Sequence, residues 1–138
     1  MATQNTDLLF AQLGDQVRAV TTQEPDFLST PAGQAVYTVT QRVGATGLTN
    51  PALLGQSFWH EMEISAYNAI CGASDPALNA AVAAGAAAAV AYIARLLVAA
   101  LGLWAIAAEL IAQLIITLFF QDTLEALCAL WKQKLGTT

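Results

Sequence analysis

The sequence contains few charged residues and few of the residue types on which catalytic and metal sites depend. Lys and Arg number five and Asp and Glu ten in 138 residues, so charged residues are 11% of the chain, against roughly 25% in a typical soluble domain. One histidine, two cysteines and four prolines are present. With a net charge of −5 and no basic patch, we expect no direct binding to nucleic acid through its phosphates.

The motifs of common enzyme classes are also missing. The isolated glycines form no phosphate-binding loop, and the serines and threonines lie in no nucleophile elbow. His60 precedes Glu61 and Glu63, but we interpret these three side chains as an exposed polar stripe rather than a ligand set on one helical face. The sequence therefore predicts a protein that is not an enzyme and that has no cofactor, no metal site and no small-molecule substrate.

A run of 44 residues from Ala77 to Phe120 contains only two formal charges, on Arg95 and Glu109. An apolar stretch of about 18 residues is already a candidate membrane span, and this run is long enough for two spans joined by a turn. A soluble domain of this size cannot easily bury a helix that is apolar on every side. We therefore expect the run to lie in lipid or in an assembly that shields it in the same way.

The run is predicted to bend at Gly102. Arg95 and Glu109 each lie seven residues from Gly102, so a hairpin that bends there brings both charges to one depth, roughly 10 Å from the bend. Opposite charges at one depth can form a buried ion pair, which lowers the cost of holding either in a dry environment. The alternative is one continuous helix of roughly 66 Å, in which the two charges need partners on neighbouring subunits.

The two halves of the run differ in side-chain size. Residues 77–94 are mostly alanine, with Ala81, Gly85 and Ala89 four residues apart, whereas residues 100–120 are rich in Leu, Ile, Trp and Phe. Because small residues let helix backbones approach closely, we predict that this strip packs against protein and that copies of the chain associate through it. The bulky half is expected to face lipid or an apolar pocket. The alternative is that the alanines simply form a good helix within the monomer.

Helix signals recur along the rest of the chain, which offers no clear pair of strands. The predicted fold class is all-α, with amphipathic helices over residues 1–73, an apolar helical hairpin over about 75–120, and a short amphipathic C-terminal tail. Residues 74–138 are expected to form one folding unit. The expected helix caps are Thr6–Asp7, Thr30–Pro31, Asn50–Pro51, Ser74–Pro76 and Asp122, and the expected stops include Gly44, Gly72 and Gly136.

Cys71 and Cys128 lie just outside the two ends of the apolar run. A hairpin would bring these ends side by side, so a disulfide is one outcome in an oxidising setting. Two free thiols that act as small apolar side chains are the outcome that we favour.

The first six residues are polar and uncharged, and they lack the basic and apolar regions of a secretory signal. No cleavable signal peptide is therefore predicted. The expected location is a membrane, or an extracellular or virion assembly.

These features favour a structural subunit that associates with copies of itself in a filament, a pilus or a virus coat, with lipid as a further expected partner. Its layout is similar to that of archaeal virus coat proteins and conjugation-type pilins, which are short chains built on an apolar helical hairpin. One alternative is an accessory subunit of a membrane complex. Another is a pore-forming or holin-like protein with Arg95, Glu109 and Gln113 along its channel. A last one is a soluble helical toxin or carrier that hides the hairpin.

Overall fold

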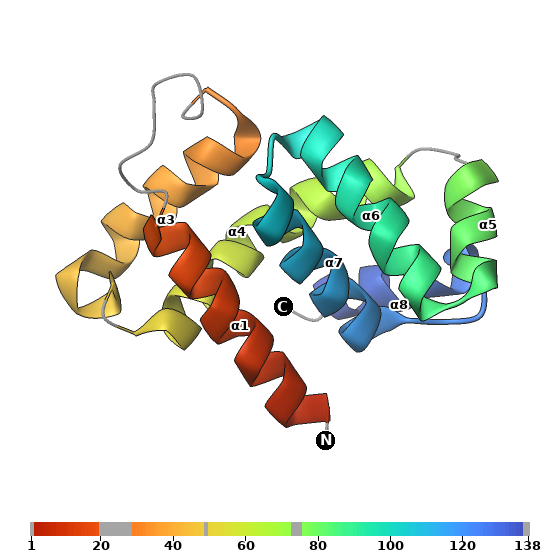
Figure 1. The fold of residues 1–138 in the computed structure, drawn as a ribbon, viewed down its shortest axis with the longest axis horizontal. Helices are drawn as coiled ribbons and strands as arrows, with labels where there is room; N and C mark the ends of the chain where they lie inside the picture. Colours follow the sequence, from red (N-terminus) through yellow and green to blue (C-terminus); the bar gives the residue numbers. More distant parts are fainter. Residues whose placement is uncertain (1, 20–28, 49, 73–75, 137–138) are drawn as a thin grey trace.

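The regular secondary structure in the described part of the chain is helical throughout. The computed structural model describes residues 2–19, 29–48, 50–72 and 76–136, and within these ranges it contains seven helices and no strand (Figure 1). This confirms the predicted all-α class. The helices are α1 (Ala2–Ala19), α3 (Pro31–Leu48), α4 (Pro51–Cys71), α5 (Pro76–Ala84), α6 (Ala86–Leu101), α7 (Ala105–Phe119) and α8 (Leu124–Gly136).

Side-chain caps set two helix starts at the positions that the sequence predicts. The Thr30 hydroxyl accepts a hydrogen bond from the backbone N–H of Gly33 at 3.0 Å, and the Asn50 side-chain oxygen accepts one from Leu53 at 3.2 Å. A proline follows each cap, where its missing N–H costs nothing because the first N–H groups of a helix have no helical partner. α4 then ends before Gly72, as the sequence also predicts.

Other predicted boundaries are wrong or lie outside the described residues. α1 begins at Ala2, ahead of the expected cap at Thr6–Asp7, and α3 continues through Gly44. An interior glycine costs a helix only about 1 kcal/mol relative to alanine, so a single glycine does not have to end it. Residues 74 and 75 of the expected cap Ser74–Pro76 are not described, although α5 does begin at Pro76.

The apolar run is not one continuous helix, because α6 ends at Gly102. This residue has φ 73° and ψ 18°, a left-handed conformation that glycine adopts without strain, and its N–H donates to the Val98 carbonyl at 3.2 Å. α7 begins three residues later, at Ala105, and runs back along α6 (Figure 1). A Cβ atom at Gly102 would meet the Thr30 side chain, so the turn also lies close to the start of α3.

A second glycine interrupts the alanine-rich half of the run. Gly85 has φ 133° and ψ 176°, which is not helical, and it separates α5 from α6. Ala81 and Ala89 therefore lie on different helices, and the continuous strip of small residues predicted from their spacing is wrong. Apart from its neighbours in the chain, no described residue has an atom within 4 Å of the position that a Cβ would take at Gly85, so no described helix packs closely there.

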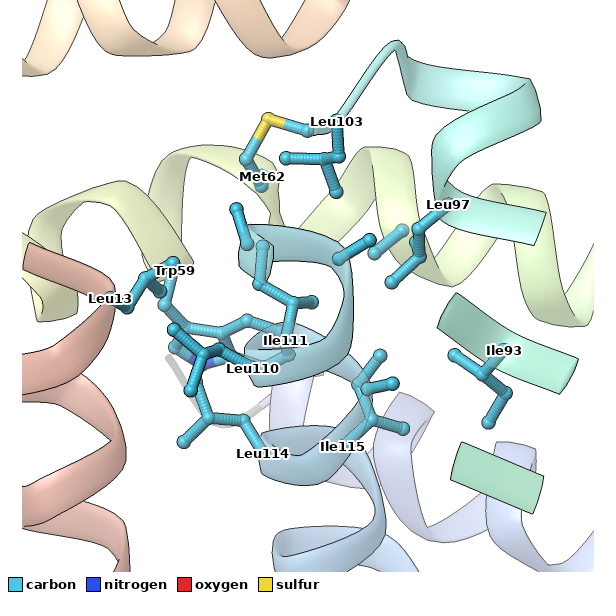
Figure 2. Packing of buried hydrophobic residues seen from close by; sticks show 14 of the residues in the cluster. Leu13, Trp59, Met62, Ile93, Leu97, Leu103, Leu110, Ile111, Leu114 and Ile115 are labelled. Carbon is cyan, nitrogen blue, oxygen red and sulfur yellow. The ribbon is translucent and has the colours of Figure 1, made fainter. Parts of the chain in front are cut away.

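α7 lies at the centre of the hydrophobic core, which takes residues from both the 1–73 and the 74–138 regions. Nine of its 15 residues are buried. In Figure 2 its side chains point in several directions, with Leu110 and Leu114 toward Leu13 of α1 and Ile115 toward Ile93 of α6. Burying a Leu or Ile side chain contributes about 1.5–3 kcal/mol, so the fold places these residues where its own helices cover them.

The two halves of the apolar run differ in how far the chain itself buries them. The bulky half is covered by the protein's own helices, whereas a face of the alanine-rich half is exposed. A helix that is apolar on several sides can thus be buried in a chain of this length, provided that other helices surround it. Alanine gains little from burial, since it has no atoms beyond Cβ to remove from water.

No helix in the described ranges is by itself long and apolar enough to cross a membrane. α7 and α8 together meet that test by length and composition, but they are bent by 87° at the break between them. A buried core helix passes the same test, and α7 is such a helix.

α4 is in contact with α1, α3, α6 and α8. Its tightest contact is with α1, where a Cβ at Gly55 would collide with the carbonyl of Phe10 and a Cβ at Gly14 with the carbonyl of Pro51. These two glycines let the backbones of α1 and α4 approach each other more closely than any side chain would allow.

The aromatic side chains of α4, α7 and α8 meet around Trp131, which is fully buried. Its ring stacks on Phe119 at 5.2 Å and on Trp59 at 6.1 Å, and it meets Tyr67 edge-on at 5.3 Å. Its Nε1–H donates to Glu63 at 3.1 Å, which satisfies the one polar atom of the ring. α8 is therefore anchored to α4 by packing as well as by a hydrogen bond.

Candidate interaction surface

An open groove of about 770 Å³ runs between α6 and α7. Its α6 wall is built from alanine and valine with a single charge, and its α7 wall adds one small residue and two polar ones. The residues that line it are Ala87, Val90, Ala91, Ala94, Arg95, Val98 and Ala99 of α6 and Ala105, Glu109 and Gln113 of α7.

Arg95 and Glu109 are the two charged residues of this groove, one on each wall. Both are exposed, so the predicted burial of this pair is wrong. α7 turns most of its Leu and Ile side chains to the core, which leaves Glu109 on the solvent-exposed side of the helix. Neither charge therefore needs a partner to offset desolvation.

The two charges also form no salt bridge with each other. Among the described residues no carboxylate lies within salt-bridge distance of Arg95, whose guanidinium lies 5.8 Å from the centroid of the Tyr92 ring. Glu109 accepts a long hydrogen bond of 3.5 Å from Gln113. Both charged groups therefore keep most of their hydrogen-bonding capacity for a further partner.

The rest of the groove presents apolar surface to solvent. Ala87, Ala91 and Ala99 are exposed, and Val98 is 43% exposed. Beside the groove, Ile106 of α7 is 56% exposed. These exposed apolar side chains beside a pair of charges make the groove the candidate interaction surface of the described residues.

A second, more polar groove of about 390 Å³ lies on the other side of Glu109, between α1 and α7. Gln12, Asp15 and Gln16 form its α1 side. Asp15 is paired with Arg18 at 2.8 Å, and Gln16 accepts a hydrogen bond from the Trp104 ring at 3.1 Å. Since Asp15 and Gln16 already have partners within the chain, this groove is a weaker candidate than the apolar one.

Cys71 and Cys128 form a disulfide, with their Cα atoms 5.8 Å apart. The favoured expectation of two free thiols is therefore wrong. The two residues meet because α8 folds back against the end of α4, rather than because two arms of a hairpin end side by side. The bond fixes α8 on the molecule next to the Trp131 cluster.

His60 and Glu63 share a face of α4, where His60 Nδ1 lies 3.7 Å from a Glu63 oxygen. The prediction that these side chains do not lie on one helical face is wrong for this pair, which is three residues apart. Glu63 is engaged by Trp131, and Glu61 pairs with Arg42 of α3 at 3.2 Å. In the part of the chain that the structure describes, no three His, Cys, Asp or Glu side chains are grouped as metal ligands would be.

Sequence reasoning missed the glycine contact between α1 and α4. The pairs Phe10–Gly14 and Pro51–Gly55 each span four residues, which is the spacing that places two residues on one helical face. In the alanine tract the same spacing of Ala81, Gly85 and Ala89 predicts a packing strip, but the helix breaks at Gly85 instead. It also missed that Glu63 is the hydrogen-bond acceptor of Trp131, because the two are 68 residues apart.

Comparisons of the chain with protein-family models, with curated proteins and with solved structures find no match. The function is therefore inferred from the chemistry of the groove.

Proposed function

We propose that the protein is a non-enzymatic structural subunit that associates with copies of itself through the groove between α6 and α7. The observation that carries this proposal is the exposure of alanine and valine along α6, whose opposite face is buried in the core. Burying apolar surface contributes roughly 25 cal/mol per Å², so covering this face favours association. A filament, a pilus or a virus coat combines such a contact with further contacts between subunits.

The small size of the exposed side chains also supports the proposal. Ala87, Ala91 and Ala94 follow one another along the groove, so the helix of another molecule can approach α6 closely. A close approach increases the number of van der Waals contacts, each worth only about 0.1–0.2 kcal/mol but collectively large. Alanine also loses no rotamer freedom when it is covered.

The test is the mass of the purified protein without detergent, measured by sedimentation and by electron microscopy. We expect oligomers or ordered particles for the native sequence and a shift to monomer for Ala91→Glu, which places a charge in the groove. The matched control is Ala129→Glu, which adds the same charge to an exposed alanine of α8. A monomeric native protein, or equal effects of both variants, would contradict the proposal.

A pore-forming role is the second candidate, because Arg95, Glu109 and Gln113 lie in one groove. Several copies in a membrane would place these polar groups along a shared path. This role predicts dye leakage from lipid vesicles and its loss in Glu109→Ala. Association without detergent and without leakage would favour the structural subunit.

A further inference from the structure

We infer that the occupant of the groove is a second copy of this chain, related by a two-fold axis that runs along the groove, with Arg95 of each copy facing Glu109 of the other. This inference rests on the proposed self-association and adds its geometry and the two residues that align the copies. Such an interface is isologous: one patch meets itself, and each contact occurs twice.

The positions of the two charges carry the inference. Arg95 and Glu109 lie on opposite walls of the groove, and each is seven residues from Gly102, where α6 and α7 join. In antiparallel helices this equal spacing places both charges at a similar distance from the turn. A two-fold axis along the groove exchanges the two walls without changing that distance, so each charge meets its opposite.

Other arrangements of two copies are electrostatically worse. A two-fold axis that crosses the groove at the level of the two charges places α6 over α6 and α7 over α7, so Arg95 meets Arg95 and Glu109 meets Glu109. Like charges placed against each other across an interface cost several kcal/mol. The axis along the groove therefore gives two favourable charge contacts, where the axis across it gives two unfavourable ones.

The surrounding surface fits the same arrangement. With the axis along the groove, α6 of one copy lies over α7 of the other, and the four helices form a bundle. The alanines of α6 let the helices approach, while Val98 and the neighbouring Ile106 supply apolar area that is now exposed. Among the described residues the guanidinium of Arg95 forms no salt bridge and lies over the Tyr92 ring, so its N–H groups are available for a carboxylate.

Charge reversal tests the pairing in the full-length protein by sedimentation equilibrium without detergent. Arg95→Glu and Glu109→Arg should each weaken dimer formation at least about tenfold, since each creates two like-charge contacts. The double variant R95E/E109R should restore the native dissociation constant to within about threefold. An equimolar mixture of the two single variants should form dimers more tightly than either variant alone, because both contacts in the mixed dimer join opposite charges.

Lys132→Glu on α8 is the matched control, because it changes the net charge to −7, as Arg95→Glu does, away from the groove. Single reversals that weaken association no more than this control would overturn the pairing and leave self-association standing. Failure of the double variant or of the mixture to recover tight dimer formation would also overturn the pairing. A native protein that stays monomeric would overturn the proposed function as well.

Discussion

α4 and α6 differ in composition, and their places in the fold are the opposite of what composition alone suggests. α4 carries a histidine, two glutamates and several amides, yet four other helices pack against it. α6 carries one charge, Arg95, yet leaves one side exposed along a groove. Burial of a helix in this molecule depends on how well individual residues, such as Gly55, Trp59 and Cys71, fit against the helices beside them. It does not follow the fraction of apolar residues in the helix.

The largest expected effect on stability comes from removing the disulfide that joins α4 to α8. Replacing Cys71 and Cys128 together by serine opens a loop of 57 residues, and we expect a loss of about 4 kcal/mol in the free energy of unfolding. Urea unfolding followed by circular dichroism measures it, and reduction of the native protein by a dithiol should give a similar loss. A loss below about 1 kcal/mol would mean that the packing of Trp131 alone holds α8.

Added side-chain bulk should have different effects on the two helices. Gly55→Val places side-chain atoms against the carbonyl of Phe10, and overpacking of this kind costs about 3 kcal/mol because two helix backbones must separate. Ala91→Val adds side-chain bulk to the exposed face of α6 and should change the free energy of unfolding by less than about 0.5 kcal/mol. Equal losses in thermal or urea unfolding would contradict the distinction between a closed contact and an open face.

A substitution at Gly85 should have a smaller effect than the loss of the disulfide or the Gly55→Val substitution. Gly85→Ala forces an L residue into φ 133°, and we expect a loss of about 1–2 kcal/mol although nothing crowds the position. The measurement is the unfolding midpoint together with the helical signal at 222 nm. A rise in helicity without a loss of stability would mean that α5 and α6 merge into one helix, which would restore the strip predicted from the sequence.

Much of the local structure was predictable because it depends on neighbours in the chain. The caps at Thr30 and Asn50 act over three residues, and the prolines after them favour helix starts whatever lies elsewhere. The left-handed turn at Gly102 likewise needs only a residue without a Cβ. Where the prediction relied on spacing alone, as for Ala81, Gly85 and Ala89, the same lack of a Cβ at Gly85 allowed the helix to break.

The candidate site was only partly predictable. The equal spacing of Arg95 and Glu109 from Gly102 correctly indicated that the two residues share one region, and both line the groove. Their exposure was not predictable, because it depends on which face of α7 turns toward α1 and α6. The disulfide and the contact between Trp131 and Glu63 join residues that are 57 and 68 positions apart, and no local pattern connects them.

The amino-acid sequence by itself determined that this chain is helical, where two of its helices begin, and that its apolar residues need shelter from water. Only the tertiary structure decided which of these apolar residues are buried inside the molecule. The reason is geometric, because a hydrophobic core is formed by several helices at once. Other helices enclose the large side chains of α7, while alanines of α6 face outward.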